Sequence, residues 1–299
     1  MKIMITGGNG QVGFELQRQL CLLGRVLAPT REALDLADAN AVEQWLKIHQ
    51  PDLIVNAAAY TAVDKAEEEP ALARRLNAEL PAQLAAYSAR RGQRLVHYSS
   101  DYVYPGCGET PWQESDATRP LSVYGHTKLA GDQAVQASGC AHLIFRTSWV
   151  YSARGHNFMK TMLRLGRERD ALKVVSDQIG APTPARLIAQ VTALALADGI
   201  ARQSRAPTRL AGLYHLAPAG ETSWQGFACE IFRQAITIGE ALVITPERVA
   251  PIPTGDYPTP ATRPLNSRLN CQALEQALGI TLPSWQGQLS LTLAEHLNT

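Results

Sequence analysis

The sequence predicts an α/β fold with a doubly wound parallel sheet and a smaller C-terminal lobe. In the first half, short apolar segments of strand type alternate with segments of helical spacing, as in βαβ units. The first strand also runs directly into a glycine-rich loop and a helix. After about residue 147, Pro and Gly become frequent, which marks a change of architecture. Right-handed crossovers in the first half would place helices on both faces of one sheet.

Each element follows from its local pattern. Strands are expected where four to seven mostly apolar residues stand between turn signals, and helices where apolar residues recur every three or four positions. The expected strands are 2–6, 25–28, 52–56, 93–98 and 141–147, and the helices between them are 11–22, 39–49, 70–91 and 121–138. Further helices are expected in the second half near 156–168, 184–200, 222–236 and 284–297.

The loop after the first strand has the spacing of a dinucleotide-binding turn. Gly7, Gly10 and Gly13 form a G-x-x-G-x-x-G frame that opens a helix. The first glycine allows the tight turn, the second lets the backbone approach a pyrophosphate, and the third allows the helix to pack on the strand. An ordinary βα loop is the alternative. In this context we predict a Rossmann-type dinucleotide-binding domain over 1–147 and a mainly substrate-binding lobe over 148–299, with some later segments returning to the first sheet.

Tyr124 and Lys128 are four residues apart on an expected helix and therefore share one face. With the charges roughly 5 Å apart, at an effective dielectric of about 20, the ammonium would favour the phenolate by about 3 kcal/mol. The pair therefore predicts a tyrosine that can give up and retake a proton. The alternative is a half-exposed helix on which the two residues meet by chance.

Composition excludes several other classes. The net charge of +1 and the dispersed basic residues give no basic stripe for nucleic acid. Five scattered cysteines without a C-x-x-C pair, and seven histidines without ligand spacing, predict neither a disulfide framework nor a metal site. No signal peptide and no apolar run of about 20 residues is evident, so we expect a cytoplasmic protein without a membrane partner.

Residues that follow the expected strands should line the site, because ligands of a parallel sheet bind at the carboxyl ends of its strands. Asn56 is followed by three alanines, which leave room for a flat cofactor or simply form a packed turn. Ser100 and Asp101 follow the next long strand. With Tyr124 and Lys128 they complete a hydroxyl, tyrosine and lysine constellation suited to carbonyl chemistry.

These motifs resemble the extended short-chain dehydrogenase/reductase family and, within it, the dTDP-4-dehydrorhamnose reductases. The wider resemblance rests on the glycine frame, the Asn56 run, Ser100 and Tyr124-x-x-x-Lys128. The closer one covers nearly the whole chain, including the second lobe, where substrate-specific families diverge. It rests on segments 10–13, 55–65, 97–105, 110–112, 146–151, 177–178, 180–183, 212–215, 263–264 and 266–267.

The resemblance implies hydride transfer from a reduced nicotinamide to the C4 carbonyl of dTDP-4-dehydro-6-deoxy-L-mannose, giving dTDP-L-rhamnose, a precursor of lipopolysaccharide and O-antigen. It implies that Tyr124 protonates the alkoxide, that Lys128 lowers the pKa of Tyr124 and binds the nicotinamide ribose, and that Ser100 donates to the same oxygen. The family usually has Thr at the position of Ser100. The hydroxyl is retained, so we expect activity with a less restricted rotamer.

The resemblance also implies binding residues. Substrate contacts are Ser100, Asp101, Tyr124, Trp149 and Arg263, although a tryptophan after a strand is often core and Arg263 could be a solvated loop residue. The cofactor contacts are Gly7, Gly10, Gln11, Val12, Gly13, Thr30, Arg31, Asp35, Leu36, Ala59, Tyr60, Thr61, Tyr98, Tyr124 and Lys128.

The cofactor preference depends on the end of the second strand. An NAD-selective site places an acidic residue there for the ribose 2′-hydroxyl, whereas this chain has Thr30 and Arg31, which suit a 2′-phosphate. We therefore predict NADPH, with Glu32 keeping NADH open as a second cofactor. Two other functions remain: another nucleotide-sugar epimerase or reductase of the extended family, and a non-catalytic dinucleotide-binding regulatory subunit. Homodimers are common in the family, but the sequence locates no interface.

Overall fold

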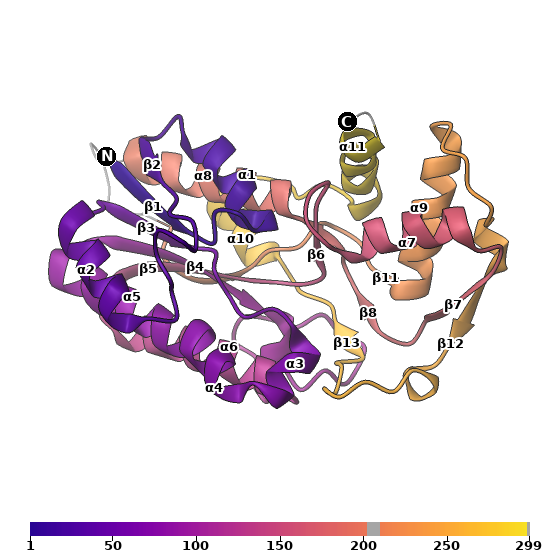
Figure 1. Cartoon of the computed structure of the whole chain (residues 1–299), viewed down its shortest axis with the longest axis horizontal. Coiled ribbons are helices and arrows are strands. Elements are labelled where there is room, and N and C mark those ends of the chain that lie inside the picture. Colours follow the sequence, from indigo (N-terminus) through magenta and orange to yellow (C-terminus); the bar gives the residue numbers. More distant parts are fainter. Residues whose placement is uncertain (202–209, 298–299) are drawn as a thin grey trace.

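The computed structural model describes residues 1–201 and 210–297, and its centre is a six-stranded parallel sheet (Figure 1). The sheet contains all five predicted strands and one further strand, so the predicted fold class is confirmed. Its strand order is β10-β5-β4-β3-β1-β2. The strands are β1 (Lys2–Thr6), β2 (Arg25–Leu27), β3 (Leu53–Asn56), β4 (Arg94–Ser100), β5 (Ala141–Thr147) and β10 (Gly212–His215).

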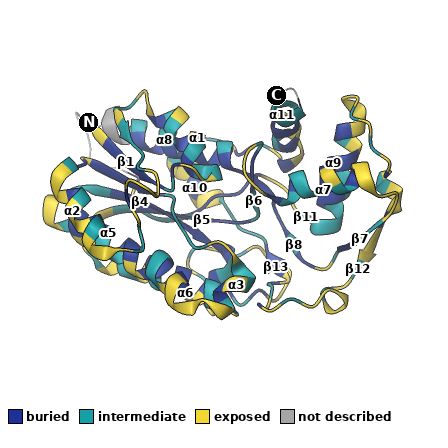
Figure 2. Cartoon of the chain, in the orientation of Figure 1, coloured by how far each residue is buried: buried dark blue, intermediate teal, exposed yellow. Residues whose placement is uncertain are grey.

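Alternation along the strands produces two cores, one on each face of the sheet. Ile3 and Ile5 face a cluster with α1 (Gln11–Leu20), α8 (Ala185–Ala201) and α10 (Gln272–Leu278). Met4, between them, faces the opposite cluster. There the sheet is covered by α2 (Ala39–His49), α5 (Leu80–Arg91) and α6 (Val123–Ala137). Figure 2 shows the consequence: the central strands are buried, whereas the outer faces of α2 and α5 are exposed.

The region predicted as one helix over 70–91 contains three successive segments. α4 (Pro70–Arg74) passes into a π-helical turn, η1 (Arg75–Glu79), and then into α5. A proline has no amide hydrogen to donate, so Pro81 in the first turn of α5 interrupts the i to i−4 ladder at this point. The short helix α3 (Val63–Glu68) precedes them, and a 3₁₀ turn, η2 (Asp101–Val103), follows β4.

A third core lies around three helices of the C-terminal half, namely α7 (Phe158–Glu168), α9 (Trp224–Thr237) and α11 (Trp285–Leu297). Asn157 and Ser223 cap α7 and α9 by accepting hydrogen bonds from backbone amides. The remaining strands are short: β6 (Val150–Tyr151), β7 (Leu172–Val175), β8 (Ile179–Gly180), β9 (Thr183–Pro184), β11 (Thr222–Ser223), β12 (Val249–Ile252) and β13 (Asn266–Ser267), with 3₁₀ turns η4 (Pro246–Arg248) and η5 (Thr254–Asp256).

Segments from the second half of the chain also complete the first sheet. β10 pairs with β5 at its edge, and α8 packs against α1. Later segments of the chain thus lie at this sheet. The assignment of cofactor binding to 1–147 and of substrate binding mainly to 148–299 stays a prediction. In the described part of the chain, no helix has the length and hydropathy needed to cross a membrane.

Candidate active site

The candidate site lies where β4 and β5 end and α6 begins. Ser100 is the last residue of β4 and is paired in register with Thr147 at the end of β5. Ser122 caps α6 by accepting a hydrogen bond from the amide of Gly125 at 3.2 Å. A Cβ atom on Gly125 would lie 2.3 Å from the carbonyl oxygen of Tyr102, so only glycine lets the first turn of α6 approach the end of β4 so closely.

Tyr124 lies in this first turn, with its ring edge-on to that of Tyr102 at a centroid distance of 5.4 Å. Burial raises the pKa of Tyr124 to about 12, and a hydrogen bond with Ser100 acts in the opposite direction. The expectation that Lys128 brings this pKa towards neutrality is wrong for this structure. Burial dominates, because removing a phenolate from water is costly, and Lys128 is not among the groups that shift this pKa.

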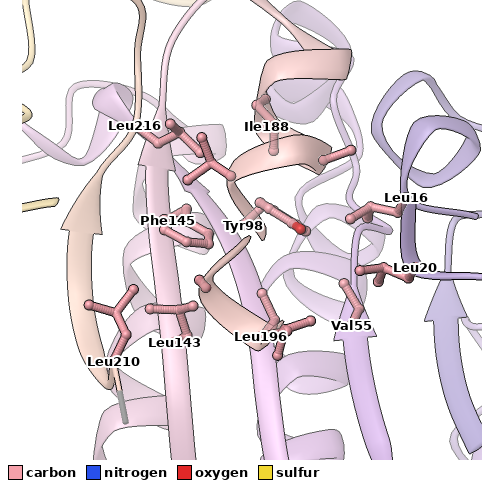
Figure 3. Close-up of a cluster of buried hydrophobic side chains, with 14 of the residues drawn as sticks. Leu16, Leu20, Val55, Tyr98, Leu143, Phe145, Ile188, Leu196, Leu210 and Leu216 are labelled. Carbon is pink, nitrogen blue, oxygen red and sulfur yellow. The ribbon is translucent and has the colours of Figure 1, made fainter. Parts of the chain in front are cut away.

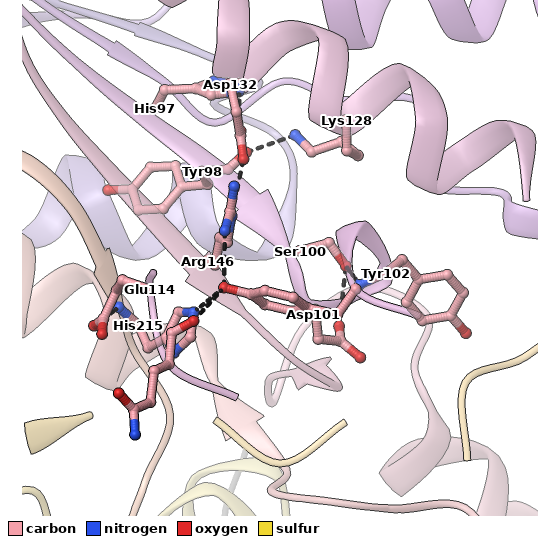
Figure 4. A network of polar contacts seen from close by, with 12 residues as sticks. His97, Tyr98, Ser100, Asp101, Tyr102, Glu114, Lys128, Asp132, Arg146 and His215 are labelled. Carbon is pink, nitrogen blue, oxygen red and sulfur yellow. Dashed lines mark hydrogen bonds and ion pairs between the residues drawn. The ribbon is translucent and has the colours of Figure 1, made fainter. Parts of the chain in front are cut away.

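Lys128 is directed into the protein beneath the site (Figure 4). Its side chain is almost fully buried, and Nζ donates a hydrogen bond of 2.5 Å to the carbonyl oxygen of Tyr98. Burial lowers the pKa of Lys128 to about 8, whereas the carboxylate of Asp132 raises it. The ammonium is therefore held in a fixed place and titrates close to neutral pH.

Ser100 and Asp101 form the opposite wall. The Ser100 hydroxyl donates to Oδ1 of Asp101 at 3.0 Å and accepts from the amide of Tyr102 at 3.2 Å. Asp101 is only 2% exposed. Burial raises its pKa to about 6, and the hydroxyls of Ser267 and Ser100 oppose that rise. This carboxyl group changes charge within the range in which enzymes work.

The glycine loop is shaped for close backbone approach. Gly7 has φ +67°, and its carbonyl oxygen accepts the amide of Gly10 at 2.9 Å. A Cβ atom on Gly13 would lie 2.1 Å from that same oxygen. Gly10 is the N-cap of α1, and no side chain of the described residues caps this helix. The loop thus provides both the space and the free amides that a pyrophosphate requires.

Gln11 connects the glycine loop to the second half of the chain. Its Oε1 accepts hydrogen bonds from Ser152 at 3.1 Å and from Asn157 at 2.9 Å. Arg154 lies 3.9 Å above the ring of Phe14, the next helical turn of α1. Val12 is half-buried against the core beneath the loop.

The residues after β2 and β3 follow the two strands that flank β1 in the sheet. Thr30 and Arg31 are exposed, and the Thr30 hydroxyl hydrogen-bonds the carboxylate of Glu32. Asp35 accepts from the amide of Ala37 at 3.0 Å, and Leu36 packs against the core.

After β3, the buried Asn77 of the π turn holds the backbone of Tyr60: its Oδ1 accepts the Tyr60 amide at 2.8 Å, and its Nδ2 donates to the Tyr60 carbonyl at 3.1 Å. The Tyr60 hydroxyl donates to Glu69 at 2.7 Å. Ala59 and Thr61 flank this anchored residue.

Three other predicted residues lie in different environments. The Tyr98 ring is in the core shown in Figure 3, its hydroxyl 2.8 Å from that of Thr192, so only its carbonyl faces Lys128. Trp149 has φ +48°, a costly conformation for a bulky residue, and stacks on Trp224 at 3.8 Å. Arg263 pairs with Asp64 at 2.7 Å, and its side chain is 18% exposed.

Comparison with known proteins shows the family. Residues 1–298 match the family described as RmlD substrate binding domain. The chain belongs to this family. A dTDP-4-dehydrorhamnose reductase of Shigella flexneri is 47% identical over 303 residues, covering 100% of this chain and 99% of the relative. One from Burkholderia thailandensis is 46% identical, with 100% of both chains covered.

Solved structures of the family agree with the fold. A dTDP-4-dehydrorhamnose reductase from Clostridium acetobutylicum has a TM-score of 0.90 and 37% identity, with 100% of both chains covered. Another, from Bacillus anthracis in complex with NADP, has a TM-score of 0.86 and 33% identity, covering 98% of this chain and 99% of that one. This RmlD-family chain thus shares its whole length with reductases of known structure.

Sequence reasoning missed the side chains behind the site. Asp132 follows Lys128 by one helical turn, so the i, i+4 spacing could have identified it. Arg146 forms an ion pair with Asp132 at 3.0 Å, and Trp224 supports Trp149 from a distant segment. No local pattern predicts either contact. No group of three or more His, Cys, Asp or Glu residues suited to a metal is found in the part of the chain that the structure describes.

Proposed function

We propose that this protein reduces the C4 keto group of dTDP-4-dehydro-6-deoxy-L-mannose with NADPH, giving dTDP-L-rhamnose in the last step of dTDP-rhamnose biosynthesis. The observation that carries the proposal is the hydrogen bond of Ser100 with Tyr124, one helical turn before the buried Lys128, in a chain of the RmlD family that also has an uncapped glycine loop. The full-length relatives named above are reductases of this substrate class. Such an enzyme is an NADP-dependent oxidoreductase.

The residues around the glycine loop fit a dinucleotide. The space that a Cβ atom on Gly13 would fill, and the free amides after Gly10, suit its pyrophosphate, beside Gly7, Gln11 and Val12. Bound NADPH supplies the hydride. We assign the 2′-phosphate to Thr30 and Arg31, the adenine side to Asp35 and Leu36, and the ribose side to Ala59, Tyr60, Thr61 and the Tyr98 carbonyl. NADH is a second cofactor in this proposal, since the Glu32 carboxylate lies next to Thr30 and hydrogen-bonds its hydroxyl.

Proton transfer is the chemistry of the side chains. As hydride reaches C4, the keto oxygen gains negative charge. Tyr124, protonated at any pH below its pKa of about 12, delivers its proton to that oxygen, and Ser100 donates a hydrogen bond to the same atom. The Lys128 ammonium would stabilise the phenolate left on Tyr124 and would also hold the nicotinamide ribose of the bound cofactor. The carbonyl thus becomes an alcohol, with a proton from Tyr124 and the hydride that bound NADPH would supply.

We assign the substrate contacts to Asp101, Trp149 and Arg263. In this proposal Asp101 and the ring of Trp149 contact the sugar, and Arg263 pairs with the diphosphate, for which its guanidinium fork is suited. A cytoplasmic location fits a biosynthetic enzyme of this kind, and a homodimer is part of the proposal because such dimers are common among extended short-chain reductases.

The test is loss of nicotinamide absorbance when the purified protein and NADPH meet dTDP-4-dehydro-L-rhamnose generated in situ. We expect rapid oxidation with dTDP-L-rhamnose as product, and a loss of at least about 100-fold in kcat for Tyr124→Phe with folding unchanged. Folded, cofactor-binding protein that oxidises no NADPH would rule the proposal out. Tightly bound NAD that copurifies without net turnover would indicate an epimerase.

A further inference from the structure

Asp132 is a fully buried carboxylate that the proposed chemistry does not use. It lies on α6 one turn beyond Lys128, with 0% of its surface exposed. Its Oδ2 accepts a hydrogen bond from Nε of Arg146 at 3.0 Å. A buried carboxylate is costly unless it is paired, so its place beside the catalytic lysine calls for a physical reason.

Arg146 is held in place by a chain of hydrogen-bonded polar groups (Figure 4). Its Nη1 donates to the hydroxyl of Tyr104 at 2.8 Å, and that hydroxyl lies 2.6 Å from Nε2 of His215. Nδ1 of His215 lies 3.1 Å from the carbonyl oxygen of Asn270, which can only accept. The His215 proton is therefore on Nδ1, Nε2 accepts from Tyr104, and this histidine is neutral, since burial lowers its pKa to about 4.

His97 closes the other side of Asp132. The amide Nδ2 of Asn56 donates to Nδ1 of His97 at 3.0 Å, because the Asn56 Oδ1 is already taken by Thr6. The proton of His97 is therefore on Nε2, which lies 3.9 Å from Oδ1 of Asp132. Burial and the nearby Lys128 lower the pKa of His97 well below its ordinary value, so His97 is neutral too.

The charges that face Lys128 from the surrounding elements are thus few. β5 contributes the cation Arg146, β4 contributes neutral His97 and Ser99, and α6 itself contributes Asp132 and the neutral phenol of Tyr124. Asp101 acts on Tyr124 from η2. Burial raises the pKa of Asp132, and the Arg146 guanidinium opposes that rise and favours the carboxylate.

We propose that Asp132 is a positioning residue, which keeps the ammonium of Lys128 charged and seated on the Tyr98 carbonyl so that Tyr124 can act as the acid. The consequence for catalysis rests on the proposed function, whereas the effect of Asp132 on the charge of Lys128 does not depend on it. Because Lys128 is buried, its ammonium depends on a nearby anion to keep its proton at neutral pH. Without Asp132 the pKa of Lys128 falls further, and less of the ammonium remains at neutral pH to stabilise the phenolate.

The test that does not depend on turnover is an NMR titration of the full-length protein labelled with ¹³C-lysine. The chain has only six lysines, and the Lys128 signal is the one missing from Lys128→Met. We expect Lys128 to titrate near pH 8 and its midpoint to fall by about 1 pH unit in Asp132→Asn. An unchanged midpoint in folded Asp132→Asn overturns the proposal.

Two variants separate charge from packing. Asp132→Glu keeps the carboxylate and should restore the wild-type midpoint. Glu15→Gln removes another buried carboxylate that also has an arginine partner but lies on α1, and it should leave the Lys128 midpoint unchanged. If Asp132→Asn does not fold, the double variant Asp132→Asn with Arg146→Gln removes both charges of the pair together, and its Lys128 midpoint should lie below that of Arg146→Gln alone.

Kinetics provide the second readout. In Asp132→Asn the alkaline limb of kcat should move to lower pH by the same amount as the Lys128 midpoint, while KM changes less than about twofold. A purely structural role would lower activity at every pH without moving that limb, which would also contradict the proposal. If wild-type protein reduces no dTDP-4-dehydrorhamnose, the proposed function fails, and the NMR midpoint still decides the role of Asp132.

Discussion

Tyr124 and Lys128 illustrate how far residue spacing alone can be used. The i, i+4 spacing correctly places both on one face of α6, and the strand-end rule brings Ser100 to the same place. The electrostatic expectation failed because it treated the pair as an isolated Coulomb interaction. Burial of both side chains now dominates their pKa values, and burial depends on tertiary packing, which no local sequence pattern contains.

At the residue scale, Asp101 is expected to make stability depend on pH. Its pKa rises from an ordinary value near 3.8 to about 6 in the folded protein. The folded protein therefore holds the Asp101 proton more tightly than the unfolded chain does. The resulting contribution to the free energy of unfolding is fully present below the ordinary pKa and is lost as pH rises through about 6. Asp101→Asn, which cannot ionise, should exceed wild type in unfolding free energy at pH 8 by up to about 3 kcal/mol, and by almost nothing at pH 4. Thermal unfolding measured across pH 4–8 checks this.

Asp177→Asn is the control for that experiment, because hydrogen bonds from Thr254 lower the pKa of Asp177 and give it the opposite sign. Its replacement should cost stability at pH 8 and little at low pH. An advantage of Asp101→Asn that is equal at pH 4 and pH 8 would show that ionisation is not the cause.

A second residue-scale prediction concerns Arg31. If its guanidinium pairs with the 2′-phosphate, Arg31→Ala should raise KM for NADPH by about 10-fold or more and leave KM for NADH nearly unchanged. Arg25→Ala, at the start of β2 before Arg31 and also exposed, is the matched control and should change neither value. Equal effects on both cofactors would argue against a phosphate contact.

At the scale of elements, the predictable features were those with strong local signals. Ser122 and Asp38 cap α6 and α2, each directly before a segment of helical spacing. The five predicted strands are all present. β10 was missed as a strand because its four residues are too short to show a period, and only pairing with β5 defines it. The π turn was missed because helical spacing continues through it.

The glycine loop gives the prediction at this scale. In Gly13→Ala the added Cβ would meet the carbonyl oxygen of Gly7, so the helix must move away from the loop. We expect a loss of about 1–3 kcal/mol in unfolding free energy and a much larger proportional loss of NADPH affinity. Gly255→Ala is the control, since nothing lies within 4 Å of its added Cβ. Binding measured by nucleotide fluorescence should distinguish them, and wild-type affinity in Gly13→Ala would contradict the assignment of the loop.

At the scale of the whole molecule, Asn157 joins the two halves. It caps α7 and donates to Gln11 of the glycine loop. Asn157→Leu should therefore cost about 1–2 kcal/mol of stability and also weaken NADPH binding by about 10-fold, because Gln11 loses its anchor. Ser223→Ala removes a comparable cap, on α9, without touching the loop, and should lower stability alone. Equal NADPH dissociation constants for the two variants would show that the bridge has no role in binding.

Long-range contacts are what the sequence could not supply. The character of the chain changes after residue 147, yet the stacking of Trp149 on Trp224 and the ion pair of Arg263 with Asp64 join residues 75 or more positions apart. Their formation depends on the finished topology. The resemblance of short motifs identified Trp149 and Arg263, but it could not predict which residues they contact.

The return of α8, β10 and α10 to the first sheet has a consequence for how the protein can be divided. The polypeptide passes several times between the six-stranded sheet and the core around α7, α9 and α11, so no single cut leaves either part with all of its strands and helices. A fragment ending at residue 147 would lack one edge strand and two covering helices, and would expose the apolar face that they protect. The gene can therefore not be shortened to an autonomous nucleotide-binding module, and the protein should melt as one cooperative unit.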